Sequence, residues 1–302
     1  MIDIAIIGAG TAGMTAAIYA RRAGMDVSVF EGNTYGGQIV ATPEVENYPG
    51  YGKISGFDLA NTIFEQASAL DANFVFDQIN SIEKTGEGFI LKGDFGSTYE
   101  AKTVIIATGA SNRHLGIDRE SELTGRGISY CATCDGAFFK GKVTAVAGGG
   151  NTAVEDALYL AGICSKVYII HRREGFRAEE TLMAKARQTE NIEILTPFVT
   201  ESLNGEGKLS SVVLKNAVDG TSRTLDIDGL FVAIGQVPAT KIFEGLVELE
   251  GGYVKAGEDC VTSCPGVFVA GDVRTKHVRQ LATAASDGAI AALAAVSCIK
   301  MQ

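Results

Sequence analysis

Short apolar runs alternate with helical patterns along the first part of the chain. Residues 2–7 and 27–30 are continuously apolar, which is typical of strands buried on both faces of a parallel sheet. Residues 11–22 between them are rich in alanine and predict a helix. Residues 57–72 have the spacing of an amphipathic helix, and residues 74–101 predict several short strands. This alternation of strand, helix and strand predicts an α/β fold.

A glycine-rich turn joins the first predicted strand to the first predicted helix. The sequence Gly8-Ala9-Gly10-Thr11-Ala12-Gly13 has the GxGxxG spacing, and Glu31 ends the next strand about 20 residues further on. Such glycines let the backbone approach a pyrophosphate at the helix N-terminus, and the acid can bind ribose hydroxyls. The pattern predicts a dinucleotide site. The alternative is a turn that only packs the helix on the sheet.

The same pattern returns in the middle of the chain. Residues 143–147 predict a strand, Gly148-Gly149-Gly150-Asn151-Thr152-Ala153 forms GxGxxA, and residues 154–161 predict a helix. The following strand ends in His171-Arg172-Arg173, with Arg177 shortly after. Arginines suit a 2′-phosphate, whereas an acid suits ribose hydroxyls, so the second site is predicted to bind NADPH. The alternative for the arginines is a solvated basic face.

The late part of the chain indicates how the domains are connected. Residues 192–234 predict short strands, residues 266–272 an apolar strand that ends in Gly271-Asp272, and residues 280–299 a helix. A strand so far from the first unit could return to the first sheet, which would make the second nucleotide domain an insertion. The prediction is an α/β protein with two Rossmann-like, three-layer domains, in which residues 113–242 are inserted into a domain formed by residues 1–112 and 243–302.

Composition narrows the class of function. The chain has 302 residues, with 26 basic against 36 acidic side chains and a net charge of −10. This balance disfavours nucleic acid or an anionic membrane as a partner. No apolar run approaches the ~18 residues of a membrane span, and no secretory leader is evident, so a soluble cytoplasmic protein is expected. Six cysteines are too few for a disulfide scaffold.

The stretch Cys131-Ala132-Thr133-Cys134-Asp135 carries the candidate chemistry. The cysteines can be a reversible redox pair, half of a zinc site with Cys260 and Cys264 or a histidine, or two inert buried thiols. Cys260 and Cys264 have a different spacing and the histidines are scattered, so the redox pair is favoured and no metal is expected. Asp135 can act as an acid near pH 7 only if burial raises its pKa far above the ordinary ~3.9. Otherwise Asp135 is a turn residue.

The two nucleotide sites and the cysteine pair together predict a reaction. NADPH gives a hydride, which a disulfide cannot accept directly, whereas a flavin can accept the hydride and pass electrons to a disulfide. The nucleotide of the first domain is therefore predicted to be FAD, and the inserted domain is predicted to bind NADPH.

The combination of motifs is also that of a known family. GxGxxG, CATCDG, GGGNTA, HRRxxxR and a late VAGD followed by Arg279-Gln280 occur in this order. The chain resembles the low-molecular-weight bacterial thioredoxin reductases along essentially its whole length. One departure is Thr11, where many relatives carry proline, and that helix start should tolerate the change.

The resemblance implies roles for individual residues. Cys134 would lie against the flavin, Cys131 would attack the partner disulfide, and Asp135 would be the acid and base. The residues expected to contact FAD are Gly8, Gly10, Thr11, Ala12, Gly13, Glu31, Gly36, Gly37, Gln38, Asn47, Ala107, Thr108, Gly109, Gly271, Asp272, Arg279, Gln280, Leu281 and Ala282. Those expected to contact NADPH are Gly148, Gly150, Asn151, Thr152, Ala153, His171, Arg172, Arg173, Arg177 and Gly235.

The resemblance further implies a homodimer that reduces thioredoxin. Arg126 with Phe138 or Phe139 could receive thioredoxin, although both phenylalanines could equally belong to the core. Because the cysteines and the NADPH site share one domain, a rotation of that domain is expected during turnover. Rival interpretations keep the scaffold but reduce another CxxC protein, take electrons from ferredoxin, or act as a flavoprotein sensor without catalysis.

Overall fold

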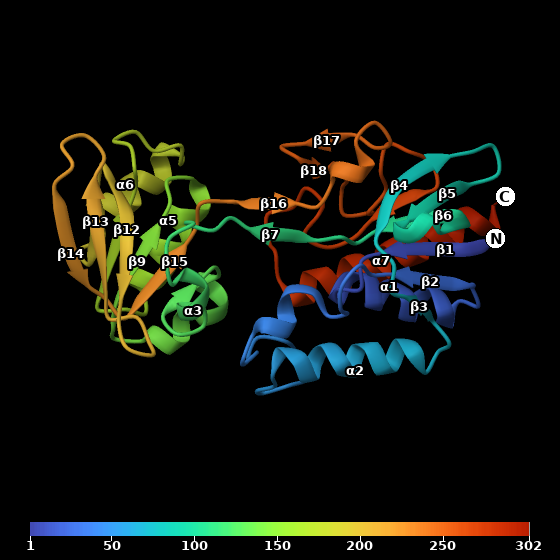
Figure 1. The fold of residues 1–302 in the computed structure, drawn as a ribbon, viewed down its shortest axis with the longest axis horizontal. Helices are drawn as coiled ribbons and strands as arrows, with labels where there is room; N and C mark the ends of the chain where they lie inside the picture. The colour runs from blue at the N-terminus through green and yellow to red at the C-terminus, as the bar shows by residue number, and fades with distance from the viewer. Residues whose placement is uncertain (302) are drawn as a thin grey trace. The chain divides into compact units, whose positions relative to one another are not determined.

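The computed structural model describes residues 1–301 and divides into two compact units (Figure 1). Unit 1 consists of Met1–Ser111 and Val237–Gln302, and unit 2 of Asn112–Gln236. The second unit is therefore an insertion between two parts of the first. The chain passes between the units beside a two-stranded sheet of β7 (Ala110–Asn112) and β16 (Gln236–Pro238).

Unit 1 is built on a seven-stranded sheet in the order β3-β2-β1-β6-β5-β4, with β19 paired to β6. The parallel part contains β1 and β6, and β19 joins it from the far end of the sequence, as expected for a discontinuous domain. The strands are β1 (Ile2–Ile7), β2 (Val27–Phe30), β3 (Asn73–Val75), β4 (Ile79–Lys84), β5 (Phe89–Gly93), β6 (Thr98–Ile106) and β19 (Val267–Val269).

Both faces of this sheet are buried, which explains the unbroken apolar runs of its strands. In β1, Ile4 and Ile6 pack into one apolar cluster, and Ala5 and Ile7 pack into the cluster on the opposite face. Adjacent side chains of a strand point to opposite faces, so every position of such a strand must be apolar.

Three helices pack against the first of these clusters. They are α1 (Thr11–Arg22), α2 (Gly56–Ser68) and α7 (Leu281–Lys300). Ser55 caps α2 by accepting a hydrogen bond from the backbone N–H of Asp58. A Cβ placed on Gly288 of α7 would lie 2.2 Å from the carbonyl oxygen of Ala12, so glycine is what allows α7 to approach α1 so closely. The remaining elements of unit 1 are η1 (Gly37–Ala41), η2 (Asp94–Gly96), η4 (Lys241–Phe243), β17 (Leu249–Glu250) and β18 (Tyr253–Val254).

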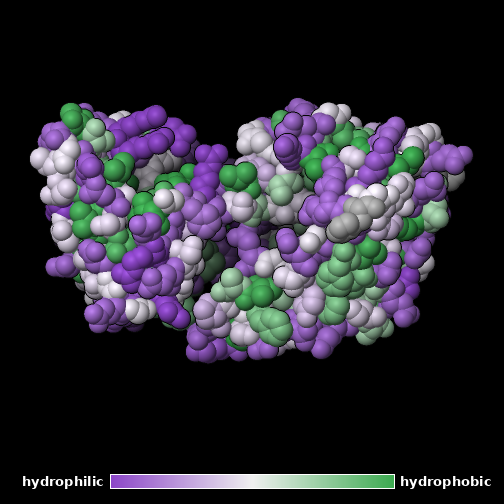
Figure 2. Space-filling model, in the orientation of Figure 1, coloured by the Kyte–Doolittle hydropathy of each residue, from purple (hydrophilic) through white to green (hydrophobic). Residues whose placement is uncertain are grey.

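Helix α7 is long and apolar in composition. Among residues 1–301 it is the one helix long and apolar enough to cross a membrane by length and composition, although no segment of that kind was expected. Its alanines and Gly288 pack against α1, and it carries a buried, ion-paired Asp287 in its middle. These contacts make it a core helix of unit 1. Figure 2 shows hydrophilic residues over most of the face in view, with smaller groups of hydrophobic residues between them.

Unit 2 repeats the strand–turn–helix–strand arrangement. Its five-stranded sheet has the order β11-β10-β9-β15-β8, with every pairing parallel. A separate antiparallel sheet has the order β12-β13-β14. The strands are β8 (Ile128–Ser129), β9 (Val143–Ala147), β10 (Lys166–Ile170), β11 (Ile192–Leu195), β12 (Phe198–Asn204), β13 (Ser211–Asn216), β14 (Ser222–Asp226) and β15 (Gly229–Val232). The helical elements are α3 (Glu120–Leu123), α4 (Ala132–Asp135), η3 (Gly136–Phe139), α5 (Asn151–Ala161) and α6 (Glu180–Gln188).

The second passage between the units comes earlier than residues 242–243, where the sequence analysis put the boundary. Residues after Gln236 already bond to unit 1: the N–H of Ala239 donates to the carbonyl oxygen of Gly109, and the Thr240 hydroxyl donates to that of Gly252. Phe243 is fully buried in unit 1. Turn-forming residues marked the region, but these tertiary contacts fix the boundary.

Candidate functional site

The first glycine turn has the geometry that a pyrophosphate site requires. Gly8 has φ +107°, and a Cβ there would lie 2.3 Å from the carbonyl oxygen of Ala107. A Cβ on Gly13 would lie 1.9 Å from the carbonyl oxygen of Gly8, so Gly13 lets α1 pack against the turn. Around Gly10 no atom lies within 4 Å of the corresponding position, which leaves that side of the turn open. Two glycines therefore serve packing and the third leaves room for a ligand.

Glu31 lies at the end of β2, directly beside this turn. Its Oε2 accepts a hydrogen bond of 2.9 Å from the N–H of Ala9, and its Oε1 accepts one of 3.0 Å from the N–H of Asn33. The carboxylate is thus held at the edge of the glycine turn, where strand β2 places it. A carboxylate oxygen can accept more than one hydrogen bond, so these contacts leave Glu31 able to accept from a ribose hydroxyl.

Several residues far apart in sequence gather near this turn within unit 1. The N–H of Gly36 donates to the carbonyl oxygen of Ala9, and the side chain of Gln38 donates to the carbonyl oxygen of Ala110. The amide of Asn47 donates to Oε1 of Gln280 over 3.2 Å. The other expected flavin contacts lie on the turn after β6 (Ala107, Thr108 and Gly109), at Gly37 in η1, and at the start of α7 (Leu281 and Ala282).

Asp272 and Arg279 each hold a buried polar atom without a hydrogen-bond partner. In the part of the chain that the structure describes, these atoms are Oδ1 of Asp272 and Nε of Arg279. Burial raises the pKa of Asp272, and the charges of Lys276 and Arg279 oppose that rise. The Arg279 guanidinium also lies 4.4 Å from the centre of the Tyr253 ring. Unsatisfied buried polar atoms are costly, so this pair fits a site completed by a polar ligand.

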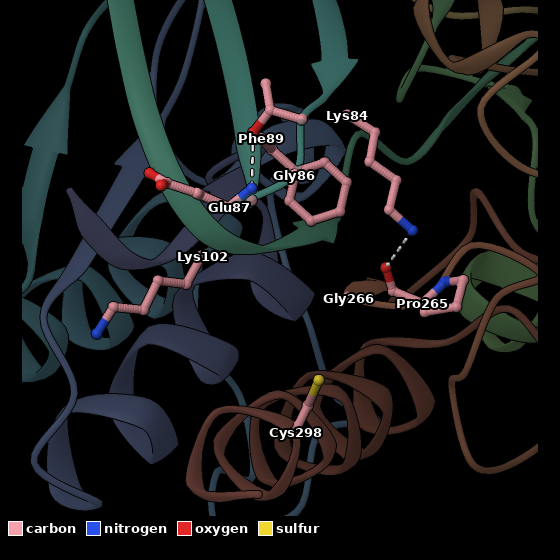
Figure 3. A pocket seen from close by; sticks show the side chains of 10 residues that line it. Lys84, Gly86, Glu87, Phe89, Lys102, Pro265, Gly266 and Cys298 are labelled. Carbon is pink, nitrogen blue, oxygen red and sulfur yellow. Dashed lines mark hydrogen bonds between the residues drawn. The ribbon is translucent and has the colours of Figure 1, made fainter. Parts of the chain in front are cut away.

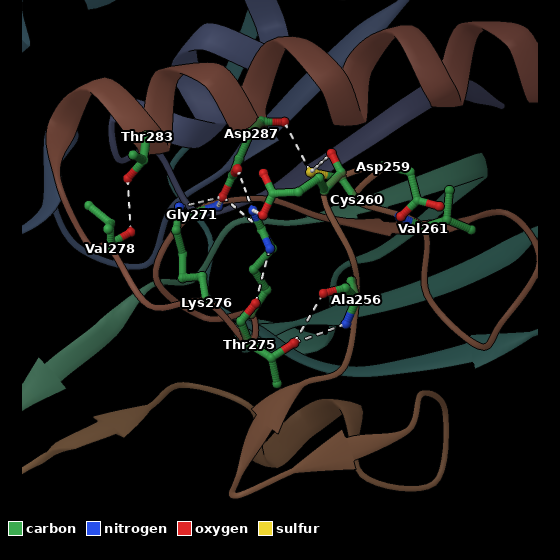
Figure 4. Close-up of polar contacts among 12 residues, drawn as sticks. Ala256, Asp259, Cys260, Val261, Gly271, Thr275, Lys276, Val278, Thr283 and Asp287 are labelled. Atoms are coloured by element: carbon green, nitrogen blue, oxygen red, sulfur yellow. Dashed lines mark hydrogen bonds and ion pairs between the residues drawn. The ribbon is translucent and has the colours of Figure 1, made fainter. Parts of the chain in front are cut away.

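A buried ionic cluster secures the loop that carries Asp272 (Figure 4). Asp287 of α7 accepts from Arg274 at 2.9 Å twice, from Lys276 at 2.8 Å, and from the N–H of Gly271 at 3.0 Å. Arg274 and Asp287 are each 2% exposed. Sequence reasoning missed this cluster, whose only signal was one acid inside an alanine-rich helix.

The second glycine turn, in unit 2, follows the same design. A Cβ on Gly148 would lie 2.4 Å from the carbonyl oxygen of Ala233, and Gly150 has open space. Asn151 is held by Glu179, since its Nδ2 donates to Oε1 at 3.1 Å and its Oδ1 accepts from the Glu179 N–H at 2.9 Å. Thr152 and Ala153 follow Asn151 in the first turn of α5, and Gly235, with φ +106°, comes shortly after β15. The turn is therefore intact and open on its ligand side.

Two of the basic residues after β10, His171 and Arg177, contact this turn at Gly149. Burial lowers the pKa of His171, a hydrogen bond with the backbone of Gly175 opposes this, and the charges of Arg172, Arg177 and Arg173 lower the pKa further. The N–H of Arg177 donates to the carbonyl oxygen of Gly149 over 2.8 Å. All three arginine side chains are exposed, and within residues 1–301 none of them is ion-paired. Such guanidinium groups are available to bind a phosphate.

Cys131 and Cys134 form a disulfide at the start of α4. Cys131 occupies the position before the helix, where its Sγ accepts a hydrogen bond from the N–H of Cys134. This pairing supports the redox interpretation over the zinc and inert-thiol alternatives. Cys260 and Cys264 are buried separately in unit 1, and among residues 1–301 no three potential metal ligands come together.

Asp135 ends α4 and is partly buried. Burial raises its pKa, and a hydrogen bond from Ser129 opposes that rise. The Ser129 hydroxyl lies 2.6 Å from Oδ2 of Asp135 and 3.0 Å from the N–H nitrogen of Cys131. Sequence reasoning did not single out Ser129, because nothing in its local pattern distinguishes it from a strand residue.

The two phenylalanines after the cysteines differ in environment. Phe138 is 44% exposed, whereas Phe139 packs edge-on against Phe231 with 5.3 Å between the ring centres. A Cβ on Gly229 would lie 2.5 Å from the Phe139 ring, so Phe139 fills a close-packed position. Phe138 and the exposed Arg126 are the members of the expected docking set with free side-chain surface.

A cavity of about 300 Å³ lies in unit 1 (Figure 3). It opens between the β4–β5 turn and the end of α7, where Lys84 donates to the carbonyl oxygen of Pro265. None of the residues expected to bind a nucleotide lines it. The cavity is therefore no part of the candidate site.

The same sequence matches known proteins over nearly its full length. The sequence profile of the family described as pyridine nucleotide-disulphide oxidoreductase matches residues 2–289. A thioredoxin reductase from Listeria innocua is 44% identical over 291 residues, which cover 96% of this chain and 91% of that protein. One from Bacillus subtilis is 43% identical over 292 residues, with 96% and 92% covered. The crystal structure of thioredoxin reductase from Streptococcus pyogenes matches with a TM-score of 0.95 and 38% identity, covering 100% of this chain and 99% of that one.

Proposed function

The chain belongs to the pyridine nucleotide-disulphide oxidoreductase family, and from this we propose that it is an NADPH-dependent flavoprotein that reduces the disulfide of thioredoxin. In this proposal unit 1 would be the FAD domain and unit 2 the NADPH domain. The net reaction consumes NADPH, one proton and a thioredoxin disulfide, and yields NADP⁺ and the thioredoxin dithiol.

The observation that carries the proposal is the disulfide between Cys131 and Cys134. It lies at the start of α4, in the same unit as the second glycine turn and the exposed Arg172, Arg173 and Arg177. A reversible disulfide can pass two electrons to another disulfide by thiolate attack and exchange. Family membership already indicates the use of a flavin and a pyridine nucleotide.

The residues of unit 1 fit FAD. The open side of Gly10 gives a pyrophosphate room at the start of α1, and Glu31 stands ready for ribose hydroxyls. Within residues 1–301, Oδ1 of Asp272 and Nε of Arg279 are buried without a hydrogen-bond partner, which fits a polar ligand bound there. When bound, FAD would supply the two-electron relay between NADPH and the disulfide. The protein would then hold and orient it and keep the cysteine pair ready for exchange.

The residues of unit 2 fit NADPH in preference to NADH. Arg172, Arg173 and Arg177 are exposed and close to His171, and a 2′-phosphate offers the dianionic oxygen set that guanidinium groups bind. The same exposed arginines would gain nothing from NADH, which lacks that phosphate. Preference for NADPH is therefore a consequence of these side chains.

The cysteine pair needs a proton donor and acceptor, and we assign that role to Asp135. Burial raises the pKa of its carboxyl, which favours the protonated form that can donate a proton. Breaking the disulfide with two electrons and one proton gives one thiol and one thiolate. Cys131 would be the thiolate that attacks thioredoxin, and Cys134 the sulfur that accepts electrons from the flavin.

Thioredoxin, a second copy of the chain and a cytoplasmic location complete the proposal. Exposed Phe138, which follows the cysteines in the chain, and exposed Arg126 would offer an apolar and a basic contact for the partner. A groove between α1, α2 and α7, lined by both apolar and polar side chains such as Ile63, Ala282 and Gln66, would be a face for a homodimer. Light scattering on the purified protein would distinguish a dimer from a monomer.

An absorbance titration tests the proposed function. The purified protein should be yellow, NADPH should bleach the flavin band much faster than NADH, and oxidised thioredoxin should restore the colour. Equal bleaching by the two nucleotides would contradict the arginine assignment. Failure of thioredoxin to restore the colour, with restoration by another CxxC protein, would contradict the proposed acceptor.

A further inference from the structure

Ser129 occupies a position between the acid and the cysteine pair. It is 4% exposed and ends β8, which pairs in parallel with β15 through Ile128 and Ser129. Its hydroxyl oxygen lies 2.6 Å from Oδ2 of Asp135, 3.0 Å from the backbone nitrogen of Cys131 and 3.3 Å from the carbonyl oxygen of Cys131. Strand pairing and burial therefore fix this hydroxyl.

The direction of these hydrogen bonds follows from the number of protons. The Cys131 N–H can only donate, so the Ser129 oxygen accepts from it. The hydroxyl has a single proton to donate. Its contact with the Asp135 carboxylate is shorter than its contact with the Cys131 carbonyl oxygen, so the hydroxyl donates to the carboxylate. A hydroxyl that donates to a carboxylate stabilises the charged form of that carboxylate.

The surroundings of Asp135 leave Ser129 as its principal polar partner. Helix α4 packs against α5, whose ionisable side chains are Glu155, Asp156 and Tyr159, and is followed by η3, which has none. Burial raises the pKa of Asp135, and the Ser129 hydrogen bond lowers it. Burial favours the neutral acid and Ser129 favours the carboxylate, so the balance between them sets where Asp135 titrates.

We propose that Ser129 is a positioning residue that holds the Asp135 carboxylate beside the cysteine pair and favours its ionised form. The role rests on the proposed function, in which Asp135 exchanges a proton with the pair. When two electrons break the disulfide, Asp135 gives one proton to a cysteine sulfur, the second sulfur remains a thiolate, and the new carboxylate keeps its hydrogen bond from Ser129. Ser129 itself gives up no proton in this step.

The test compares Ser129→Ala with Ser129→Thr, which keeps the hydroxyl. The first readout needs no turnover: the carboxyl band of Asp135 is followed against pH by infrared difference spectroscopy, with Asp135→Asn identifying the band. Loss of the hydroxyl should raise the pKa of Asp135 by about one pH unit, since one charge-assisted hydrogen bond is lost, and threonine should restore it. An Asp135 pKa that is the same in Ser129→Ala and in the unaltered protein would overturn the proposal.

The second readout separates Ser129 from a merely structural residue. In Ser129→Ala the pH profile of thioredoxin reduction should shift upward by the same amount, while the rate of flavin reduction by NADPH stays unchanged. The shift should disappear in an Asp135→Asn background, because Ser129 acts through Asp135. An equal loss of activity with and without Asp135 would refute the assignment. If the unaltered protein fails to reduce thioredoxin, the proposed function fails, and the infrared titration still tests Ser129.

Discussion

The buried Asp287 cluster gives a large, calculable prediction for the substitution Asp287→Ala. The carboxylate accepts four hydrogen bonds, from Arg274 twice, Lys276 and the N–H of Gly271. Its removal leaves two cations in a buried site, where the Lys276 side chain is only 5% exposed. Removing one partner of a buried ion pair costs about 3–5 kcal/mol, because the remaining charge stays desolvated. We expect a loss of that size in the free energy of unfolding.

The assay is thermal and urea unfolding, with the exposed partner of the same arginine as the control. For a unit of this size each kcal/mol corresponds to roughly 2–4 °C in melting temperature, so Asp287→Ala should melt about 10 °C lower. Glu258 also pairs with Arg274, at 3.2 Å, but its side chain is 89% exposed. Glu258→Ala should therefore cost no more than about 1 kcal/mol.

The cluster should also affect flavin retention. Asp287 holds Gly271, and with it the loop that carries Asp272, so Asp287→Ala should release FAD faster during gel filtration than Glu258→Ala does. Equal losses of unfolding free energy for Asp287→Ala and Glu258→Ala would refute the claim that burial makes the Asp287 carboxylate important for stability.

Burial raises the pKa of Asp287, but Arg274 and Lys276 outweigh this effect and hold that pKa below its usual range. The stability that Asp287 confers is thus present above the ordinary carboxyl pKa and is lost as the pH falls below it.

Two further predictions concern unit 2. Replacing Arg172 by alanine should raise the KM for NADPH about tenfold or more and leave the KM for NADH unchanged, because one phosphate contact is lost. Arg187 is exposed and ion-paired with Glu180, so Arg187→Ala is a control that should change neither KM. A parallel rise in the KM for both nucleotides would contradict the arginine assignment. Burial, together with the charge of Glu155, raises the pKa of Asp156 to about 7, so its stabilising contribution is present below pH ~4 and lost as the pH rises to 7. In urea unfolding, Asp156→Asn should accordingly raise the free energy of unfolding at pH 8 by up to about 4 kcal/mol and leave it unchanged at pH 4. An equal change in the free energy of unfolding at both pH values would disprove the raised pKa.

The elements that could be predicted from the sequence are those that depend on neighbouring residues or on the burial pattern of a single strand. Gly8 and Gly148 mark their turns because only glycine fits the close backbone approach there, and the apolar run of residues 2–7 reflects burial on both faces of the sheet. The sequence also shows that the glycine turn occurs twice, and that the strand after the first turn ends in Glu31 whereas the strand after the second ends in His171. These features gave the fold class and the two candidate nucleotide sites.

The parts that could not be predicted depend on contacts between distant segments. Asp287 acts on a loop that precedes it in the chain, and its partners Arg274 and Lys276 show no spacing that a sequence pattern could detect. Ser129 matters because strand pairing aims its hydroxyl at Asp135. The burial of Asp135, which decides whether its carboxyl can exchange protons near neutral pH, also required the packing of α4 on α5.

The central claim is that electrons from NADPH reach thioredoxin through Cys131 and Cys134. The most direct measurement follows the flavin absorbance of the unaltered protein and of Cys134→Ser under anaerobic conditions, first with NADPH and then with oxidised thioredoxin. Both proteins should be bleached by NADPH, but only the unaltered protein should recover its colour, with one NADPH consumed for each thioredoxin disulfide reduced. Recovery of Cys134→Ser at the rate of the unaltered protein would contradict the account.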